Sequence, residues 1–121
     1  MSIIREDAGQ ILKHSMFLLD RGFIIISEDD YSICFSKGDI KIDLFYERYD
    51  NSSDAQIKFL SNNQAYSIGW ILAIHCDEKN VESLLDKNDK QKNLLSILDF
   101  IDINFDNLMS QDYCKSMISK V

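Results

Sequence analysis

The 121-residue chain has no proline, only two histidines and no long apolar run. Its longest apolar stretch, residues 68–74, is about a third of the ~20 residues that a membrane-spanning helix requires. The N-terminus carries acids where a signal peptide would carry bases, and no cleavage site follows a hydrophobic core. The sequence therefore predicts a cytoplasmic protein that does not enter the membrane.

Motifs for catalysis, metal binding or nucleotide binding are also missing. The four glycines are isolated and form no phosphate-binding loop. Cys34, Cys76 and Cys114 have neither CxxC nor zinc-ligand spacing, so we expect buried thiols in a reducing compartment. His75 precedes Cys76, but neighbours on a strand point to opposite faces, which separates a base from its thiol. We predict a non-enzymatic protein with no catalytic residue, no metal and no cofactor.

Three carboxylates near the C-terminus are spaced for one side of a helix. Asp99, Asp102 and Asp106 lie three and four residues apart, an arrangement that can hold a hard cation. No loop of EF-hand spacing accompanies them, and no histidine or glutamate completes a transition-metal set. We interpret them as the solvated flank of an amphipathic helix.

Negative charge is concentrated in one part of the sequence. The chain has a net charge of −7, and residues 28–54 alone contain eight acids and three bases. The basic residues are scattered, whereas nucleic acids and anionic membranes bind clustered lysine and arginine. The charge distribution thus excludes both and favours an acidic surface for a basic protein partner.

Hydrophobic periodicity predicts one α+β domain over residues 1–121, with an N-terminal helix, an antiparallel meander of four to five strands and C-terminal helices packed on one face of the sheet. The first helix is expected at 2–21, with Gly22 as its left-handed stop. Strands are expected at 23–27, 31–36, 39–48, 54–60 and 64–68. The run 70–74 fits a buried strand or a helical turn, and we interpret it as a strand. Helices are expected at 80–85, 89–109 and 112–119.

The strand at 39–48 alternates most regularly. One face is expected to carry Ile40, Ile42, Leu44 and Tyr46, and the other Lys41, Asp43, Phe45 and Glu47. An aromatic ring between carboxylates suits docking, since the ring supplies buried area and the acids speed association. The candidate partner-binding residues are therefore Asp43, Phe45, Glu47, Tyr49 and Asp50. The alternative, that Phe45 lies under a helix and the acids only solubilise the strand end, stays open.

The order of these segments resembles a known class of proteins. A helix ending in Arg21-Gly22-Phe23 leads into FSKGDIKIDLFYERYD (35–50), followed by AQIKF (55–59), YSIGWILAI (66–74) and LLSILDFIDINFDNLM (94–109). In layout, size and acidity this is similar to the small bacterial immunity proteins encoded beside polymorphic or contact-dependent toxins. The resemblance implies a protein that binds one cognate toxin domain and blocks its active site. It assigns no functional residue by position.

Two other functions remain open from the sequence. One is a generic interaction domain, monomeric or forming a homodimer through an exposed edge strand. The other is a small-molecule binder with a pocket between sheet and helices, near Tyr66, Trp70 and His75.

Overall fold

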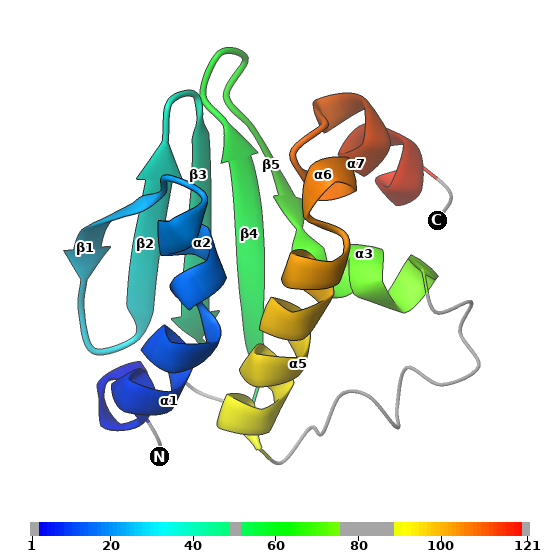
Figure 1. Cartoon of the computed structure of the whole chain (residues 1–121). Helices are drawn as coiled ribbons and strands as arrows, with labels where there is room; N and C mark the ends of the chain where they lie inside the picture. Colours follow the sequence, from blue (N-terminus) through cyan, green and yellow to red (C-terminus); the bar gives the residue numbers. More distant parts are fainter. Residues whose placement is uncertain (1–2, 49–51, 76–88, 120–121) are drawn as a thin grey trace.

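The computed structural model describes residues 3–48, 52–75 and 89–119 and arranges them in two layers (Figure 1). One layer is a five-stranded antiparallel sheet in the order β1-β2-β3-β4-β5. Helices lie against one face of it. The predicted α+β class, the meander and the helical layer are confirmed. None of the helices in the described ranges has the length and apolar character needed to cross a membrane.

The elements follow one another closely along the chain. The strands are β1 (Ile24–Glu28), β2 (Ser32–Lys37), β3 (Ile40–Tyr46), β4 (Ser53–Phe59) and β5 (Gln64–Ser67). The helical elements are the 3-10 helix η1 (Ile4–Asp7), α1 (Ala8–His14), α2 (Met16–Asp20), α3 (Ile68–His75), α5 (Lys90–Ile103), α6 (Phe105–Leu108) and α7 (Gln111–Ile118). The helix predicted at 80–85 lies outside the described residues.

Two glycines make the turns that the sequence predicts. Gly22 has φ 95° and ends the N-terminal helical segment, after which the Phe23 amide donates to the Leu18 carbonyl at 2.9 Å. Gly38 has φ 55° and closes the β2–β3 hairpin. Both positions need the left-handed conformation that glycine adopts without steric cost. Phe23, the residue after the first turn, is buried in the core.

Alternation along the central strands builds the core. The inward side chains are buried on β3 (Ile42, Leu44, Tyr46) and β4 (Ala55, Ile57, Phe59). They pack in the same cluster as buried side chains of α1 (Ile11), α2 (Leu18) and α5 (Leu94, Leu98, Ile101). The predicted inward face of the third strand is confirmed, and so is the apolar side of the long C-terminal helix. Burying these side chains together is the main favourable term in folding.

Both helices predicted as continuous are interrupted, each at a polar residue. Ser15 separates α1 from α2, and its hydroxyl donates to the Leu12 carbonyl at 3.1 Å. Asn104 separates α5 from α6, and its amide donates to the Phe100 carbonyl at 3.2 Å. Side chains that bond to the preceding turn compete with the helical ladder. Ile103, the last residue of α5, is 82% exposed and lies outside the apolar side of this helix.

The strand predicted at 70–74 is wrong, because residues 68–75 form helix α3. Its first turn is capped twice. Ser67 accepts the Trp70 amide at 3.1 Å, and Asp54, on β4, accepts the Gly69 amide at 2.8 Å. Such caps satisfy the amide groups that a helix start leaves without internal partners. The cap from Asp54 comes from a neighbouring strand, so no local pattern in the sequence reveals it.

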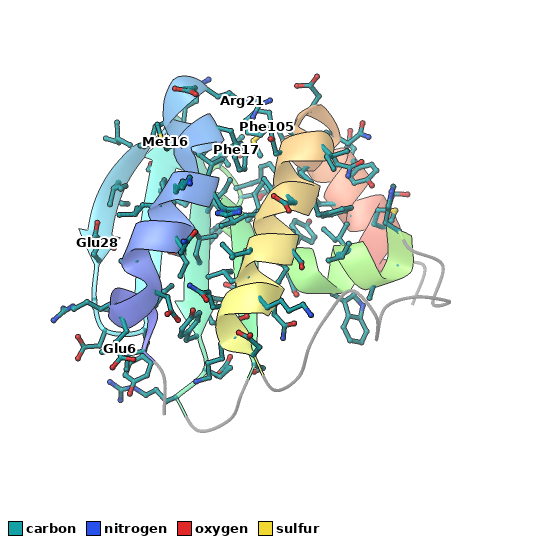
Figure 2. All side chains as sticks on the ribbon, turned by 60° about the horizontal axis from the view of Figure 1, so that its bottom comes forward. Glu6, Met16, Phe17, Arg21, Glu28 and Phe105 are labelled. Atoms are coloured by element: carbon teal, nitrogen blue, oxygen red, sulfur yellow. The ribbon has the colours of Figure 1, made fainter. Side chains whose placement is uncertain are left out.

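Arg21 joins the N-terminal and C-terminal helices. Its guanidinium lies 4.5 Å from the ring centre of Phe105 and 5.3 Å from that of Phe17, and it donates to Asp102 at 2.8 Å. Figure 2 shows Arg21, Phe17 and Phe105 together where α2 approaches α6. An arginine can stack on rings and bind a carboxylate at the same time. Asp102 therefore has a structural partner, while Asp99 and Asp106 are exposed, as expected for a solvated flank.

Candidate functional site

The sheet has one face under the helices and one face without a helix over it in the described part of the chain (Figure 1). On the uncovered face, β3 presents Lys41, Asp43 and Phe45, all half-buried. Their cross-strand neighbours are mostly polar: Asp43 lies between Cys34 of β2 and Gln56 of β4. A sheet face of mixed polarity without a covering layer is accessible to another macromolecule.

The candidate residues divide into three groups in the structure. Asp43 and Phe45 share the uncovered face, as predicted, and none of the described helices lies over Phe45. Glu47 is exposed but follows the end of β3, so it extends the row beyond the sheet. Tyr49 and Asp50 lie outside the described residues. The structure thus brings Asp43 and Phe45 together on one face, and their binding role stays a prediction.

Several acids of the 28–54 segment are engaged within the protein. Asp29 accepts the Tyr31 amide at 2.8 Å, and this bond is the largest contribution that lowers the pKa of its carboxyl. Asp39 accepts the amide of Ser61 at 3.1 Å. Asp30 forms an ion pair with Arg5 at 3.0 Å.

The sequence predicted that the acids of residues 28–54 form a binding surface. In the structure, Asp29, Asp30 and Asp39 instead bind other groups of the protein, and Asp54 caps α3. The segment is still negative, yet its carboxylates are not one uniform patch. Lys41 and Lys58 lie opposite each other on the uncovered face, toward the hairpin end of β3. Glu28 and Glu47 are exposed and Asp43 is half-buried. The acids near Phe45 that remain accessible, Asp43 and Glu47, therefore lie on the side of β3 away from the hairpin.

An open hollow of about 430 Å³ lies at that end of the sheet. It is lined by Arg5, Asp29, Asp30, Tyr31, Ser32, Phe45, Tyr46 and Arg48. The Arg48 guanidinium stacks over the Tyr31 ring at 4.9 Å from its centre. Phe45 thus lies beside a concave surface with aromatic rings and charges of both signs. Such a surface suits an inserted side chain of a partner protein, because hot spots pair aromatic and charged anchors with pockets.

A buried polar cluster holds this end of β3 in place. The Tyr46 hydroxyl donates to Asp7 at 2.5 Å. Lys90, at the start of α5, is only 5% exposed and donates its ammonium protons to the Glu47 carbonyl. Ser53 donates to the Lys90 carbonyl at 2.8 Å. These bonds connect η1, β3, β4 and α5, so the backbone beside the hollow is fixed by the core.

Burial also changes the acidity of the tyrosine in this cluster. Burial, with the Asp7 bond and charge next in size, raises the pKa of Tyr46 far above its ordinary value. A phenol in this state keeps its proton at neutral pH and acts as a hydrogen-bond donor. In residues 3–48, 52–75 and 89–119, no three histidine, cysteine or carboxylate side chains are grouped to hold a metal ion.

Two of the three cysteines have described positions. Cys34 and Cys114 are buried and free, as predicted, and Cys76 lies outside the described residues. Burial raises the pKa of both thiols to about 11, and for Cys34 the adjacent Asp43 carboxylate adds to the effect. A thiol protonated at neutral pH is a poor nucleophile.

The residues of the alternative small-molecule pocket have separate neighbours. The Tyr66 hydroxyl accepts from Gln111 at 3.4 Å, whereas the His75 ring contacts Phe100 at 5.2 Å between centres. Trp70 is half exposed on α3. The described contacts therefore do not gather these three side chains around one ligand.

Both arginines of the hollow and one of its two tyrosines, Tyr31, were not predicted from the sequence as site residues. Arg5, Tyr31 and Arg48 come from three separate segments, and only the β2–β3 pairing brings two of them together. One signal was present: Tyr46 alternates inward, and a buried tyrosine hydroxyl requires a hydrogen-bond partner. That signal predicts a polar group at the end of β3 but does not identify Asp7.

Comparisons with protein-family models, with curated proteins and with solved structures find no match to this chain.

Proposed function

We propose that this protein is a non-enzymatic, cytoplasmic binding protein that neutralises a bacterial toxin domain. The contact is made by the uncovered face at the end of β3, through Asp43, Phe45 and Glu47, with Tyr49 and Asp50 continuing the row. The toxin domain is basic, as in nucleases whose clefts bind phosphate chains. The resemblance to immunity proteins supplies the class of partner, and the surface supplies the mode of contact.

One observation carries the proposal: Phe45 is half-buried on a sheet face that no described helix covers, where it lines the hollow and shares its face with Asp43. Part of the aromatic ring is exposed to solvent in this position, and a partner can bury that apolar area. The carboxylates beside it contribute long-range attraction, which raises the rate of encounter with a basic surface. The aromatic ring that supplies buried area and the carboxylates that attract a basic partner thus lie within one short stretch of strand.

The structure beneath this surface suits a binding protein. Lys90 and Tyr46 hold the end of β3 through buried hydrogen bonds. A surface held rigid before binding loses little conformational entropy on association. Inhibition would then be steric and electrostatic, because acids that occupy a basic cleft compete with its substrate for the same charges.

The proposal predicts that a toxic C-terminal domain is encoded next to this protein's gene, and this domain is the partner used in growth protection and in binding kinetics. Asp43→Lys with Glu47→Lys should lower the association rate by about tenfold at low salt and much less at high salt, since steering is screened. Phe45→Ala should mainly raise the dissociation rate. The matched control is Asp99→Lys with Asp106→Lys, which makes the same charge change at exposed acids of α5 and α6.

The two charge variants separate a local surface from general acidity. If the control slows association as strongly as the β3 variant, the contact is not at β3. If none of the three variants changes binding or protection, the proposed surface is wrong. If the purified toxin domain does not bind the wild-type protein at all, the proposed partner class is wrong.

A further inference from the structure

β1 leaves one side of the sheet open. It is the first strand in the sheet order, and within residues 3–48, 52–75 and 89–119 only β2 pairs with it. At the opposite side β5 continues directly into α3, and α7 packs beside it (Figure 1). An open edge presents backbone amide and carbonyl groups to which another strand can hydrogen-bond.

This edge is also apolar. Ile24 is 63% exposed and lies on the uncovered face, opposite Ser36. Ile26 is 48% exposed, at the irregularity between Ile25 and Ser27. Met16 of α2 is exposed as well, and Figure 2 shows it on the β1 side of that helix, away from Phe105. Exposed apolar side chains gathered at one edge are typical of an interaction site.

Charges at the two ends of β1 have opposite sign. Glu28 ends the strand and is exposed; Figure 2 places it at the far end of β1 from Arg21. At the start of the strand, the Lys37 ammonium donates to the Arg21 carbonyl at 2.5 Å and lies beside Gly22. A second copy running antiparallel brings its Lys37 end to Glu28 of the first. Two-fold symmetry makes the same match at the other end.

From the open edge, the exposed isoleucines and this self-complementary charge pattern, we infer that β1 pairs antiparallel with β1 of a second copy of this chain. The two sheets then continue into one another, and the exposed side chains of Ile24 and Ile26 lie at the contact. This inference goes beyond the proposed function and does not rest on it. Two strands separate the β1 edge from Phe45, so the dimer displays two partner-binding surfaces.

The first experiment measures self-association of the full chain by sedimentation velocity over a wide concentration range. The wild-type protein should form dimers. Ile26→Lys should raise the dimer dissociation constant by about tenfold or more, because it places two like charges at the contact between the β1 strands. The matched control is Ile103→Lys, which makes the same change at the exposed end of α5 and should leave the constant unchanged.

A charge swap tests the antiparallel orientation of the two β1 strands. Glu28→Lys should weaken the dimer, and adding Lys37→Glu should restore it, since the swapped ends again match. Thermal unfolding of each variant confirms that the monomer fold is retained. A wild-type monomer at every concentration would overturn the inference, and so would equal weakening by Ile103→Lys or a swap that fails to restore the dimer. In a monomer, Glu28 and the irregularity in β1 would serve to keep the edge unpaired.

Discussion

Replacing Gly69 with alanine examines how the start of α3 is built. A Cβ atom at this position would lie 2.6 Å from Asp54 Oδ1 and 3.2 Å from its Cγ. The same oxygen accepts the Gly69 amide at 2.8 Å, and Oδ2 accepts the Ser67 hydroxyl at 2.6 Å. The carboxylate must therefore move away from the helix start, which weakens the cap.

The magnitude follows from two opposing effects. A hydrogen bond to a charged group contributes about 1.5–3 kcal/mol. Alanine is favoured over glycine inside a helix by about 1 kcal/mol. If one cap bond is lost, Gly69→Ala should lower the free energy of unfolding by about 0.5–2 kcal/mol. For a domain of this size that corresponds to a decrease in Tm of roughly 2–8 °C.

Urea unfolding of four variants, Gly69→Ala, Gly9→Ala, Asp54→Ala and the Asp54→Ala/Gly69→Ala double variant, checks both the sign of the stability change and its cause. Gly9→Ala is the matched control, because a Cβ at Gly9 of α1 meets no atom within 4 Å; it should stabilise the protein by about 0.5–1 kcal/mol. In an Asp54→Ala background the obstruction is absent, so Gly69→Ala should no longer destabilise. The resulting coupling energy should be about 1–3 kcal/mol. A Gly69→Ala protein as stable as the wild type would refute this account of the α3 cap.

Two further predictions concern hydrogen bonds at the sheet end. Tyr46→Phe removes the donor to Asp7 and should cost about 1.5–3 kcal/mol in urea unfolding, whereas an unchanged midpoint would mean that the bond contributes nothing. Because the pKa of Asp29 is lowered in the folded protein, its contribution to stability is present above its ordinary value of 3.8 and is lost as the pH falls through the lowered value. Asp29→Asn should therefore reduce the difference between urea midpoints at neutral and at acidic pH, and an equal difference would contradict the assignment.

The features that the sequence predicts correctly are those that contacts between near neighbours in the chain determine. Alternation from Ile40 to Tyr46 predicts both the third strand and its two faces, since a strand's side chains alternate by geometry alone. Gly22 and Gly38 were predictable for a similar reason, because each turn needs a backbone conformation that few residues adopt.

The errors arose where distant or finely balanced contacts decide the structure. Helix α3 is short and apolar on most sides, so periodicity does not distinguish it from a buried strand. The helix is favoured by Asp54 of β4, whose carboxylate accepts the Gly69 amide at the helix start. The breaks at Ser15 and Asn104 depend on one side-chain hydrogen bond each, which a polar residue makes in some helices and not in others.

The candidate site shows the same division. The shared face of Asp43 and Phe45 follows from strand geometry. The hollow does not, because Arg5, Tyr31 and Arg48 meet only after the chain has folded. Which acids remain accessible is likewise a tertiary property, since Asp29, Asp39 and Asp54 have the same chemistry as Asp43.

The meander order of the strands also bears on how the chain folds. Each strand pairs with the strand next to it in sequence, so every pairing closes only a short loop at small entropic cost. Helix α5, in contrast, packs on β4 across the intervening β5 and α3. We expect the hairpins to form before α5 docks, so that Leu98→Ala accelerates unfolding in stopped-flow measurements while leaving the folding rate nearly unchanged. A mainly slower folding rate would instead place α5 in the folding nucleus.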